Sequence, residues 1–248
     1  MAGSKPGYKE IADELRMQIE RGKYQPGEKI PSQSALMAEF QAGRETVTKA
    51  LQVLEDLGLT VSAKGRPATV REFRPIRRSA VKRLAKSVWG GGASMWSVDV
   101  QDARPVVSGL EILSIEAPPR VAEAMGIQRG DAVVLRRRHY ILKGKPVLMS
   151  DTYLPADLAN GTPMVEKDTG EGGVYARLGD IGHGPVRFKE EVRTRMPYRA
   201  EAALLQLQPG TPVLAIVRSA FDAEGRVVEV NDMVLDGGSY IVDYVFDA

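Results

Sequence analysis

The chain has 248 residues, of which 43% are hydrophobic and 27% charged, and it contains no cysteine. This length fits one large domain or two modest ones, and the composition is that of an ordinary globular protein. Without cysteine, disulfides, thiolate metal sites and cysteine nucleophiles are excluded. No apolar run is long enough to cross a membrane, and residues 1–10 lack the apolar segment of a signal peptide, so we expect a cytoplasmic protein.

The net charge of +2 conceals an asymmetry along the chain. Residues 1–90 carry 17 Lys and Arg against 10 Asp and Glu, a net +7, whereas residues 91–248 carry 17 against 22, a net −5. A basic first third suggests a polyanion as its partner. On charge alone, a chance distribution of solvated surface charge explains the asymmetry equally well.

Hydrophobic periodicity and turn residues predict three helices and a hairpin in the first 71 residues. The spacing predicts a helix over Tyr8–Arg21, a second helix capped by Ser32, and a third over Arg44–Leu57. Short apolar runs on either side of a turn at 64–67 predict two strands. Helix, helix, short turn, helix and hairpin is the layout of a winged helix-turn-helix domain.

The rest of the chain alternates strands with short helices. We predict hairpins over 132–154 and 212–235, strands at 190–196 and 239–246, and helices at 118–125, 174–178 and 199–205. The fold class is therefore α+β, with antiparallel strands in the second part. We expect a DNA-binding domain over 1–72, a basic linker over 73–92, and a second domain over 93–248.

Four segments of the first domain carry a family resemblance: Lys23–Ser32, Arg44–Leu51, Leu54–Leu59 and Lys64–Gly65. With them, the N-terminal third resembles the winged helix-turn-helix domain of the GntR superfamily of transcriptional regulators. The resemblance implies double-stranded operator DNA as a partner. The chain departs from the family pattern at Gln33 and Ser34, where an acidic residue and an arginine are common.

The second part resembles the UTRA ligand-sensing domain of the HutC branch of that superfamily, whose fold is similar to chorismate lyase. The segments that carry this resemblance are Arg136–Val147, Ser150–Pro155, Gly210–Val213 and Gly225–Glu229. The resemblance implies a domain that binds a small-molecule effector.

The predicted third helix has one apolar face for packing and one polar face for DNA. Arg44 stands at its start, where recognition helices reach base edges or phosphates, and arginine can grip guanine through two hydrogen bonds. Glu45 and Lys49 alternatively form an ordinary solvated face. We expect DNA contacts from the second and third helices and from the basic hairpin tip: Ser32, Gln33, Arg44, Glu45, Thr46, Thr48, Lys49, Lys64, Gly65 and Arg66.

Three consecutive arginines lie in the predicted strand 132–142. Strand alternation places Arg136, Arg138 and Tyr140 on one face. Clustered arginines repel one another unless an anion balances their charge. This anion is either a ligand or an internal acid such as Asp151, Glu190, Glu191 or Glu229. The residues alone leave both open, and the UTRA resemblance favours a ligand. It implies an effector site built from arginines, hydroxyl groups and one glutamate: Arg136, Arg138, Tyr140, Ser150, Thr152, Tyr153 and Glu229.

Two other segments contain residue types that are common in binding sites. The glycine-rich segment 168–173 lacks the Gly-Lys-Ser/Thr of a phosphate loop, so it is either a plain loop or a lid over a pocket. His183 is isolated, and with two histidines in the chain we expect no metal site and no cofactor.

We therefore predict a homodimeric, cytoplasmic repressor that leaves a palindromic operator when an anionic effector binds. Dimerisation is expected because one winged domain offers few base contacts, and two of them match a palindrome. Two alternatives remain. In one, the C-terminal domain only dimerises and the repressor is constitutive. In the other, this domain is a lyase-like enzyme, although no nucleophile–histidine–acid arrangement supports catalysis.

Overall fold

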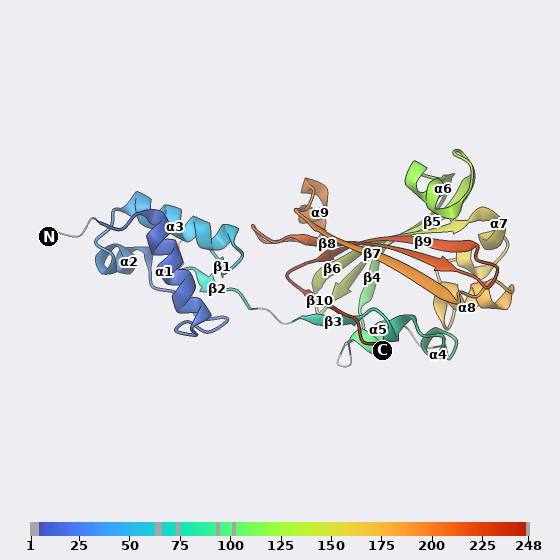
Figure 1. Cartoon of the computed structure of the whole chain (residues 1–248), viewed down its shortest axis with the longest axis horizontal. Helices are drawn as coiled ribbons and strands as arrows, with labels where there is room; N and C mark the ends of the chain where they lie inside the picture. Colours follow the sequence, from blue (N-terminus) through green and yellow to red (C-terminus); the bar gives the residue numbers. More distant parts are fainter. Residues whose placement is uncertain (1–4, 63–65, 73–74, 93–94, 101–102, 247–248) are drawn as a thin grey trace. The chain divides into compact units, whose positions relative to one another are not determined.

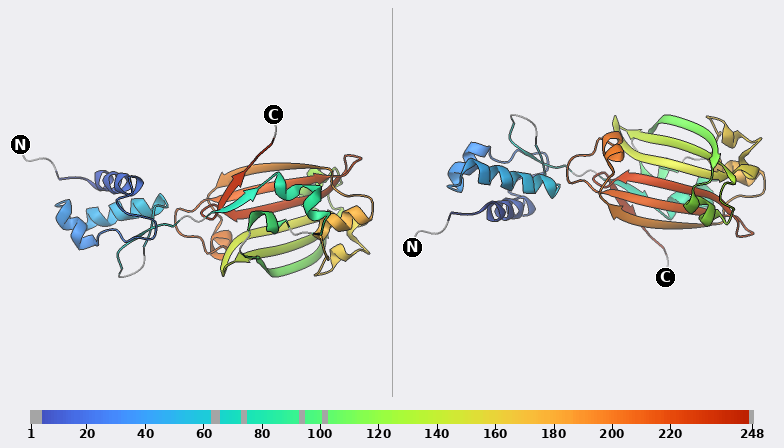
Figure 2. Two further views of the ribbon diagram at one scale, coloured as in Figure 1. Left: turned by 90° about the horizontal axis from the view of Figure 1, so that it is seen from below. Right: turned by 90° about the horizontal axis from the view of Figure 1, so that it is seen from above.

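The computed structural model describes residues 5–62, 66–72, 75–92, 95–100 and 103–246. The chain divides into two compact units (Figures 1 and 2). One comprises Met1–Arg74 with Leu207–Thr211, and the other comprises Pro75–Gln206 with Pro212–Ala248. Within the described residues, no helix combines the length and the apolar character needed to span a membrane.

The first unit is a bundle of three helices followed by a hairpin. Its elements are α1 (Tyr8–Glu20), α2 (Gln33–Glu39), α3 (Arg44–Asp56), β1 (Thr60–Val61) and β2 (Thr69–Val70). The two strands pair antiparallel. One residue stripe of each helix is fully buried and forms the core: Ile11, Leu15, Leu36, Val47, Ala50 and Leu54. The predicted winged helix-turn-helix is confirmed.

The ends of these helices follow the expected local chemistry. The Ser32 hydroxyl accepts a hydrogen bond from the Ala35 amide at 3.2 Å, so the predicted cap of α2 is confirmed. Gly43 precedes α3 and offers no side chain to cap it, which leaves the first amides of α3 without a side-chain acceptor. Gly58 follows α3 with φ +71°, a backbone conformation that ends helices and favours glycine.

The second unit is built on a six-stranded antiparallel sheet with the strand order β4-β5-β6-β9-β8-β7. Its strands are β4 (Val106–Glu116), β5 (Ala132–Leu142), β6 (Lys145–Pro155), β7 (Arg187–Arg195), β8 (Val213–Phe221) and β9 (Val227–Asp236). A separate parallel pair joins β3 (Ile76–Ser79) to β10 (Tyr240–Asp243). Both predicted hairpins, β5–β6 and β8–β9, are confirmed.

Helices and the β3–β10 pair cover the two faces of this sheet (Figure 2). α6 packs on one face against β9, and its Val121 and Met125 belong to the same buried apolar cluster as Val133 and Leu135 of β5. β3 and β10 lie over the other face, together with the short segments that follow β3. The remaining elements are η1 (Lys82–Leu84), α4 (Lys86–Trp89), α5 (Trp96–Asp99), α6 (Pro119–Met125), α7 (Ala156–Ala159), η2 (Pro163–Val165), α8 (Gly173–Asp180) and α9 (Arg199–Leu204).

Two parts of this unit differ from the sequence-based expectation. The expected linker 73–92 contributes β3, η1 and α4 to the second unit over residues 75–92. The basic composition of this segment suggested a solvated linker. Two of its arginines, Arg78 and Arg83, are instead buried, with 1% and 4% of their surface exposed. β4 was not predicted either. The alternation of side chains between the two faces of β4 is interrupted by a register shift between Ser108 and Glu111, where Gly109 has φ +61°.

Candidate functional site

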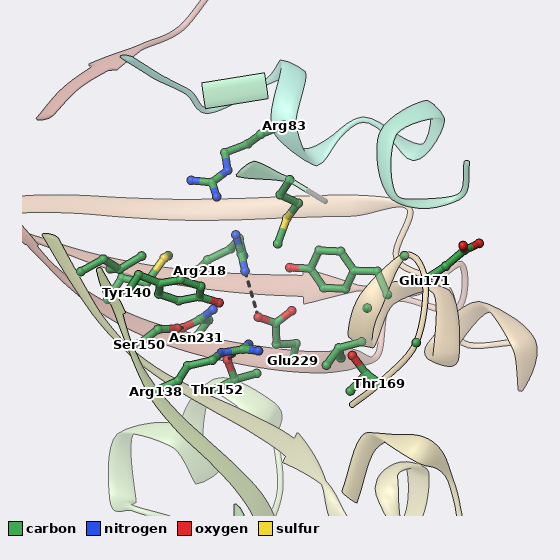
Figure 3. Close-up of a pocket in the computed structure, with 18 of the residues that line it drawn as sticks. Arg83, Arg138, Tyr140, Ser150, Thr152, Thr169, Glu171, Arg218, Glu229 and Asn231 are labelled. Carbon is green, nitrogen blue, oxygen red and sulfur yellow. Dashed lines mark hydrogen bonds and ion pairs between the residues drawn. The ribbon is translucent and has the colours of Figure 1, made fainter. Parts of the chain in front are cut away.

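A cavity of about 260 Å³ lies in the second unit, on the sheet face that α6 does not cover. Its floor comes from four adjacent strands of the sheet. Its walls come from the loop and first turn of α8 at 169–175 and from three residues that follow β3, namely Arg83, Gly92 and Met95 (Figure 3). Residues far apart in the chain therefore meet at this cavity. The site is small enough to hold a compact metabolite.

Strand register brings the floor residues into two rows. Arg138, Ser150 and Met233 lie side by side across β5, β6 and β9. Thr152 and Asn231 form the second row with Arg218 of β8. Because side chains alternate along each strand, all of them face the same side of the sheet.

A hydrogen bond between two side chains orders this floor. The Ser150 hydroxyl donates to the Asn231 side-chain oxygen at 2.9 Å, and both residues are buried. This bond fixes the Asn231 amide, so that its NH₂ group remains to donate elsewhere.

Arg138 is half-buried and reaches into the cavity from β5. Its Nη2 donates to the Thr152 hydroxyl at 3.2 Å, and its guanidinium carbon lies 5.8 Å from the centre of the Tyr140 ring. Among the residues that the structure describes, no carboxylate forms an ion pair with Arg138. A guanidinium group in this position is able to form charge-assisted hydrogen bonds with an anion.

Arg218 and Glu229 form a buried ion pair beside Arg138. The Arg218 Nη2 donates to Glu229 Oε1 at 3.0 Å, and the two side chains are 2% and 3% exposed. Burial alone lowers the pKa of Arg218, but Tyr175, Glu229 and Glu190 raise it further than burial lowers it. Arg218 therefore stays charged, and its charge is balanced within the protein.

Two of the seven expected effector residues lie away from the cavity. Arg136 donates to the carbonyl oxygens of Met164 and Glu166, both at 2.6 Å, and so holds the segment around η2 against the sheet. Burial lowers its pKa to about 10. Tyr153 alternates onto the opposite face and packs in the cluster beneath α6. The structure brings the other five together: Arg138, Tyr140, Ser150, Thr152 and Glu229.

The middle arginine of the run has an internal partner, as the alternative interpretation allowed. Arg137 faces the other side of the sheet from the cavity, and its Nη2 lies 2.8 Å from the Asp151 carboxylate. The hydrogen bond with Asp151 raises the pKa of Arg137 despite some burial. The three arginines thus have three different environments: backbone carbonyls, a carboxylate and a cavity.

Several lining residues were missed by the sequence analysis. Arg218 and Asn231 each interrupt an apolar strand. A polar residue at such a position indicates a buried polar group, which is common in binding sites. Arg83 carried no such signal, because it stands among other basic residues. The segment 169–173 lines the cavity and is joined to the wall opposite by a hydrogen bond from the Gly172 amide to the Gly92 carbonyl at 3.2 Å.

In the first unit, the exposed side of α3 carries the expected DNA-contacting residues. Arg44 is exposed at the start of the helix. Glu45 and Lys49 form an exposed ion pair at 2.8 Å, in which the lysine lowers the pKa of Glu45 through a hydrogen bond and its charge. This pairing is what a solvated helix face would show, and it leaves Lys49 free to exchange partners with a phosphate.

Gln33 and Thr48 connect α2 to α3. The Gln33 amide donates to the Thr48 hydroxyl, which in turn donates to the Arg44 carbonyl at 2.8 Å. Thr46 is half-buried, and Arg66 is exposed beside the hairpin tip. Lys64 and Gly65 lie outside the described residues.

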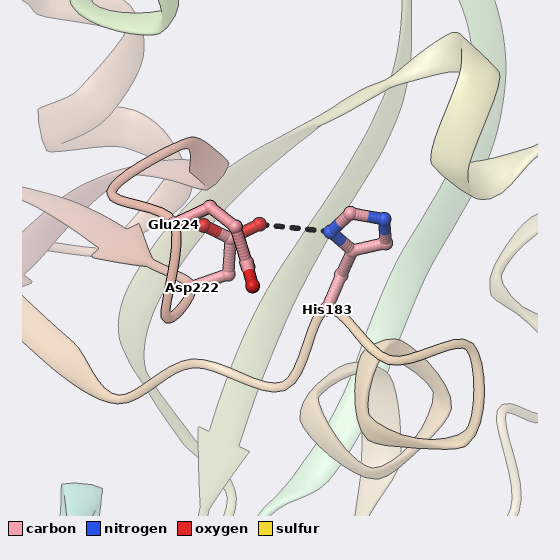
Figure 4. A group of neighbouring side chains, drawn as sticks. All are labelled: His183, Asp222 and Glu224. Atoms are coloured by element: carbon pink, nitrogen blue, oxygen red, sulfur yellow. Dashed lines mark hydrogen bonds and ion pairs between the residues drawn. The ribbon is translucent and has the colours of Figure 1, made fainter.

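His183 has neighbours that the sequence did not suggest. One ligand atom from each of His183, Asp222 and Glu224 lies within 4.8 Å of the others (Figure 4). His183 Nδ1 lies 2.8 Å from Asp222 Oδ2, and the other Asp222 oxygen accepts the Arg226 amide at 2.8 Å. These bonds tie the loop after α8 to the β8–β9 turn.

Comparison with known proteins assigns both units. Residues 7–70 match the gntR family of bacterial regulatory proteins, and residues 101–240 match the UTRA domain. The chain belongs to the GntR family of regulators that carry a UTRA domain. The residues that match the UTRA domain include the floor of the cavity, and those that match the gntR family include α1, α2 and α3.

Full-length relatives support this assignment. The regulator is 30% identical to an uncharacterised HTH-type transcriptional regulator of Streptomyces coelicolor, over 99% of this chain and 94% of that protein. It is 27% identical to the mannosyl-D-glycerate transport/metabolism system repressor of Escherichia coli, over 96% and 95% of the two chains. A crystal structure of a GntR-family transcriptional regulator superposes with a TM-score of 0.70 at 26% identity, covering 98% of each chain. The protein is therefore a DNA-binding transcriptional regulator.

Proposed function

We propose that this regulator is a repressor that leaves its operator when a small anionic molecule occupies the cavity lined by Arg138. The observation that carries the proposal is the Arg138 guanidinium, which faces the cavity and has no carboxylate partner among the described residues. An anionic effector supplies that partner, and a charge-assisted hydrogen bond in a sheltered cavity is about twice as strong as a neutral one.

The other lining groups suit the neutral part of such a molecule. Glu229 accepts hydrogen bonds, Asn231 donates and accepts them, and Thr169 offers a hydroxyl from the loop before α8. A few polar groups that converge on one small cavity are typical of a metabolite site. An anion with hydroxyl or amide groups fits this lining better than an apolar anion.

We propose that α2 and α3 bind the operator, with contacts from Ser32, Gln33, Arg44, Glu45, Thr46, Thr48, Lys49 and the tip at 64–66. The free amides at the start of α3 and the exposed Arg44 support this face, because helix starts and arginines bind phosphate and base edges. Two copies of the chain, dimerised through the second unit, would present two such faces to a palindromic operator in the cytoplasm.

The experiment has two parts, operator selection and effector release. The operator is selected from random duplexes with the purified full-length protein. Release is then followed by fluorescence anisotropy in a panel of small anionic metabolites and their neutral analogues. A hundredfold loss of operator affinity requires about 2.7 kcal/mol of coupling, within the usual range for allosteric proteins.

Arg138→Gln should bind the operator like the wild type but no longer respond to the anion. Arg137→Gln is the matched control, since it removes one charge from the same strand on the face away from the cavity. Equal release of the two variants would exclude Arg138 as the effector contact. If no compound releases the wild-type protein, the constitutive-repressor alternative is favoured. Conversion of a bound compound would instead favour the lyase-like alternative.

A further inference from the structure

The wall of the cavity includes the chain segment that leads from the first unit into the sheet. Arg83 of η1, Gly92 and Met95 all line the cavity, and η1 directly follows β3. Figure 3 shows Arg83 and Arg138 approaching the cavity from opposite sides, with Arg218 between them. Arginine side chains from two parts of the chain therefore line the cavity: Arg83 from the segment after β3, and Arg138 and Arg218 from the sheet.

Arg83 already has an acidic partner away from the sheet. Its Nη1 lies 3.2 Å from an Asp99 carboxylate oxygen, and the two side chains are 4% and 0% exposed. Burial lowers the pKa of Arg83 to about 10, and the neighbouring cations Arg78 and Arg218 add to this effect. Arg83 is therefore a buried cation next to other cations, and additional negative charge nearby would stabilise it.

The surrounding acids are engaged elsewhere. Arg78 forms two hydrogen bonds to Glu190, and Arg218 pairs with Glu229. Among the described residues, Asp99 is the acid with which Arg83 forms an ion pair. The Arg83 guanidinium thus lies between the Asp99 carboxylate and the cavity that it lines.

We propose that Arg83 is a second anion contact of the cavity, bound to Asp99 when the cavity is empty and to an acidic group of the effector when it is occupied. This inference rests on the proposed function, because it assumes an anionic occupant. It adds that the occupant directly contacts the segment that continues from β3. Binding then shifts η1 relative to α5, which carries Asp99.

The charges around Asp99 make the exchange sensitive to pH. Asp99 is faced by Arg83 from η1, by Arg78 from β3, and by Asp243 and Tyr240 from β10. Burial raises its pKa to about 6 despite the two arginines. Below that pH, Asp99 is neutral and no longer competes, so the affinity for an anion rises as the pH falls through 6.

Sulfate is a suitable probe, because its charge does not change over this pH range. Trp89 reports binding by fluorescence: it is 3% exposed, and its ring centre lies 5.8 Å from that of Tyr175, which lines the cavity. Trp96→Phe leaves it as the single tryptophan of the full-length protein. Sulfate replaces chloride at constant ionic strength, at about pH 5.5 and about pH 7.5.

Arg83→Gln should weaken sulfate binding about ten-fold or more, as the loss of a charge-assisted contact does. Lys82→Gln is the matched control, because this neighbour on η1 is exposed and does not line the cavity. Asp99→Asn should bind sulfate about five-fold more tightly at pH 7.5 and should lose most of the pH dependence. Unfolding temperatures verify that each variant is folded.

The outcomes separate this inference from the proposed function. If Arg83→Gln binds like Lys82→Gln while Arg138→Gln loses sulfate, Arg83 is not a contact and the proposed function stands. If Arg138→Gln binds like the wild type and Arg83→Gln does not, the assignment of Arg138 fails instead. Should Arg83→Gln not fold, Asp99→Asn decides, and unchanged affinity and pH dependence in that variant would overturn the exchange.

Discussion

The Arg78–Glu190 ion pair is buried in the second unit, and Glu190→Gln tests how much it stabilises the fold. The pair joins β3 to β7 through hydrogen bonds of 2.9 and 2.5 Å, and its side chains are 1% and 6% exposed. Arg218 lies 4.0 Å from the same carboxylate. Substitution by glutamine keeps the shape but leaves two buried guanidinium groups facing a neutral amide.

Removal of one partner from a buried pair costs about 3–5 kcal/mol, because the remaining charge stays desolvated. At about 2–4 °C per kcal/mol for a chain of this size, the unfolding temperature should fall by roughly 6–20 °C. Replacement of both partners by Arg78→Met with Glu190→Leu should cost less than Glu190→Gln alone, since no charge of this pair is then left buried.

Calorimetry at neutral pH measures the loss, with Glu191→Gln as the control. Glu191 is the next residue on β7, but its side chain is 66% exposed and pairs with Lys189 at 3.2 Å, so its loss should cost little. An equal shift in the two variants would refute the reasoning, because burial would then not matter.

The pH dependence of this loss provides a second test. Burial raises the pKa of Glu190, but the hydrogen bonds and charge of Arg78 lower it overall, below its ordinary value of 4.5. The pair therefore stabilises the fold fully above pH 4.5, and this contribution disappears as the pH falls through the lower folded-state pKa. The difference between wild type and Glu190→Gln should shrink in acid and stay constant from pH 5.5 upwards.

Three further predictions concern the caps, the cavity wall and the DNA face. Ser32→Ala removes the cap of α2 and should lower the free energy of unfolding by about 1 kcal/mol in urea titrations followed by circular dichroism. Gly172→Ala should destabilise the fold by about 1–3 kcal/mol, because φ is +75° and a built Cβ lies 2.4 Å from a backbone carbonyl oxygen. The control Gly179→Ala, with open space around it, should unfold at nearly the wild-type temperature. Arg44→Ala should weaken operator binding and reduce the slope of its salt dependence by about 1, whereas Arg21→Ala, at the end of α1, should not; equal losses would remove Arg44 from the DNA face.

The sequence by itself determined the elements whose signals are local. Apolar residues at helical spacing located α1 and α3, Ser32 marked the start of α2, and turn residues marked the hairpins β5–β6 and β8–β9. The α+β class and the winged helix-turn-helix follow from these elements, and strand alternation alone separated Arg137 from Arg138. Such features depend on residues within one or two turns of each other, which the sequence shows directly.

Only the tertiary structure decided which polar side chains meet at the cavity. Tyr240 pairs with Ile76 across more than half of the chain, and this pairing brings the segment after β3 over the sheet. It therefore places Arg83 in the same cavity as Arg138 and Arg218, although Arg83 resembles any other basic residue of its segment. The surroundings of the arginines also decide what each one does. Arg136 and Arg138 lie on the same face of the sheet, but Arg136 donates to carbonyl oxygens whereas Arg138 faces the cavity. Partners and desolvation, which set the charge chemistry of a site, are properties of packing between distant segments and cannot be read from spacing.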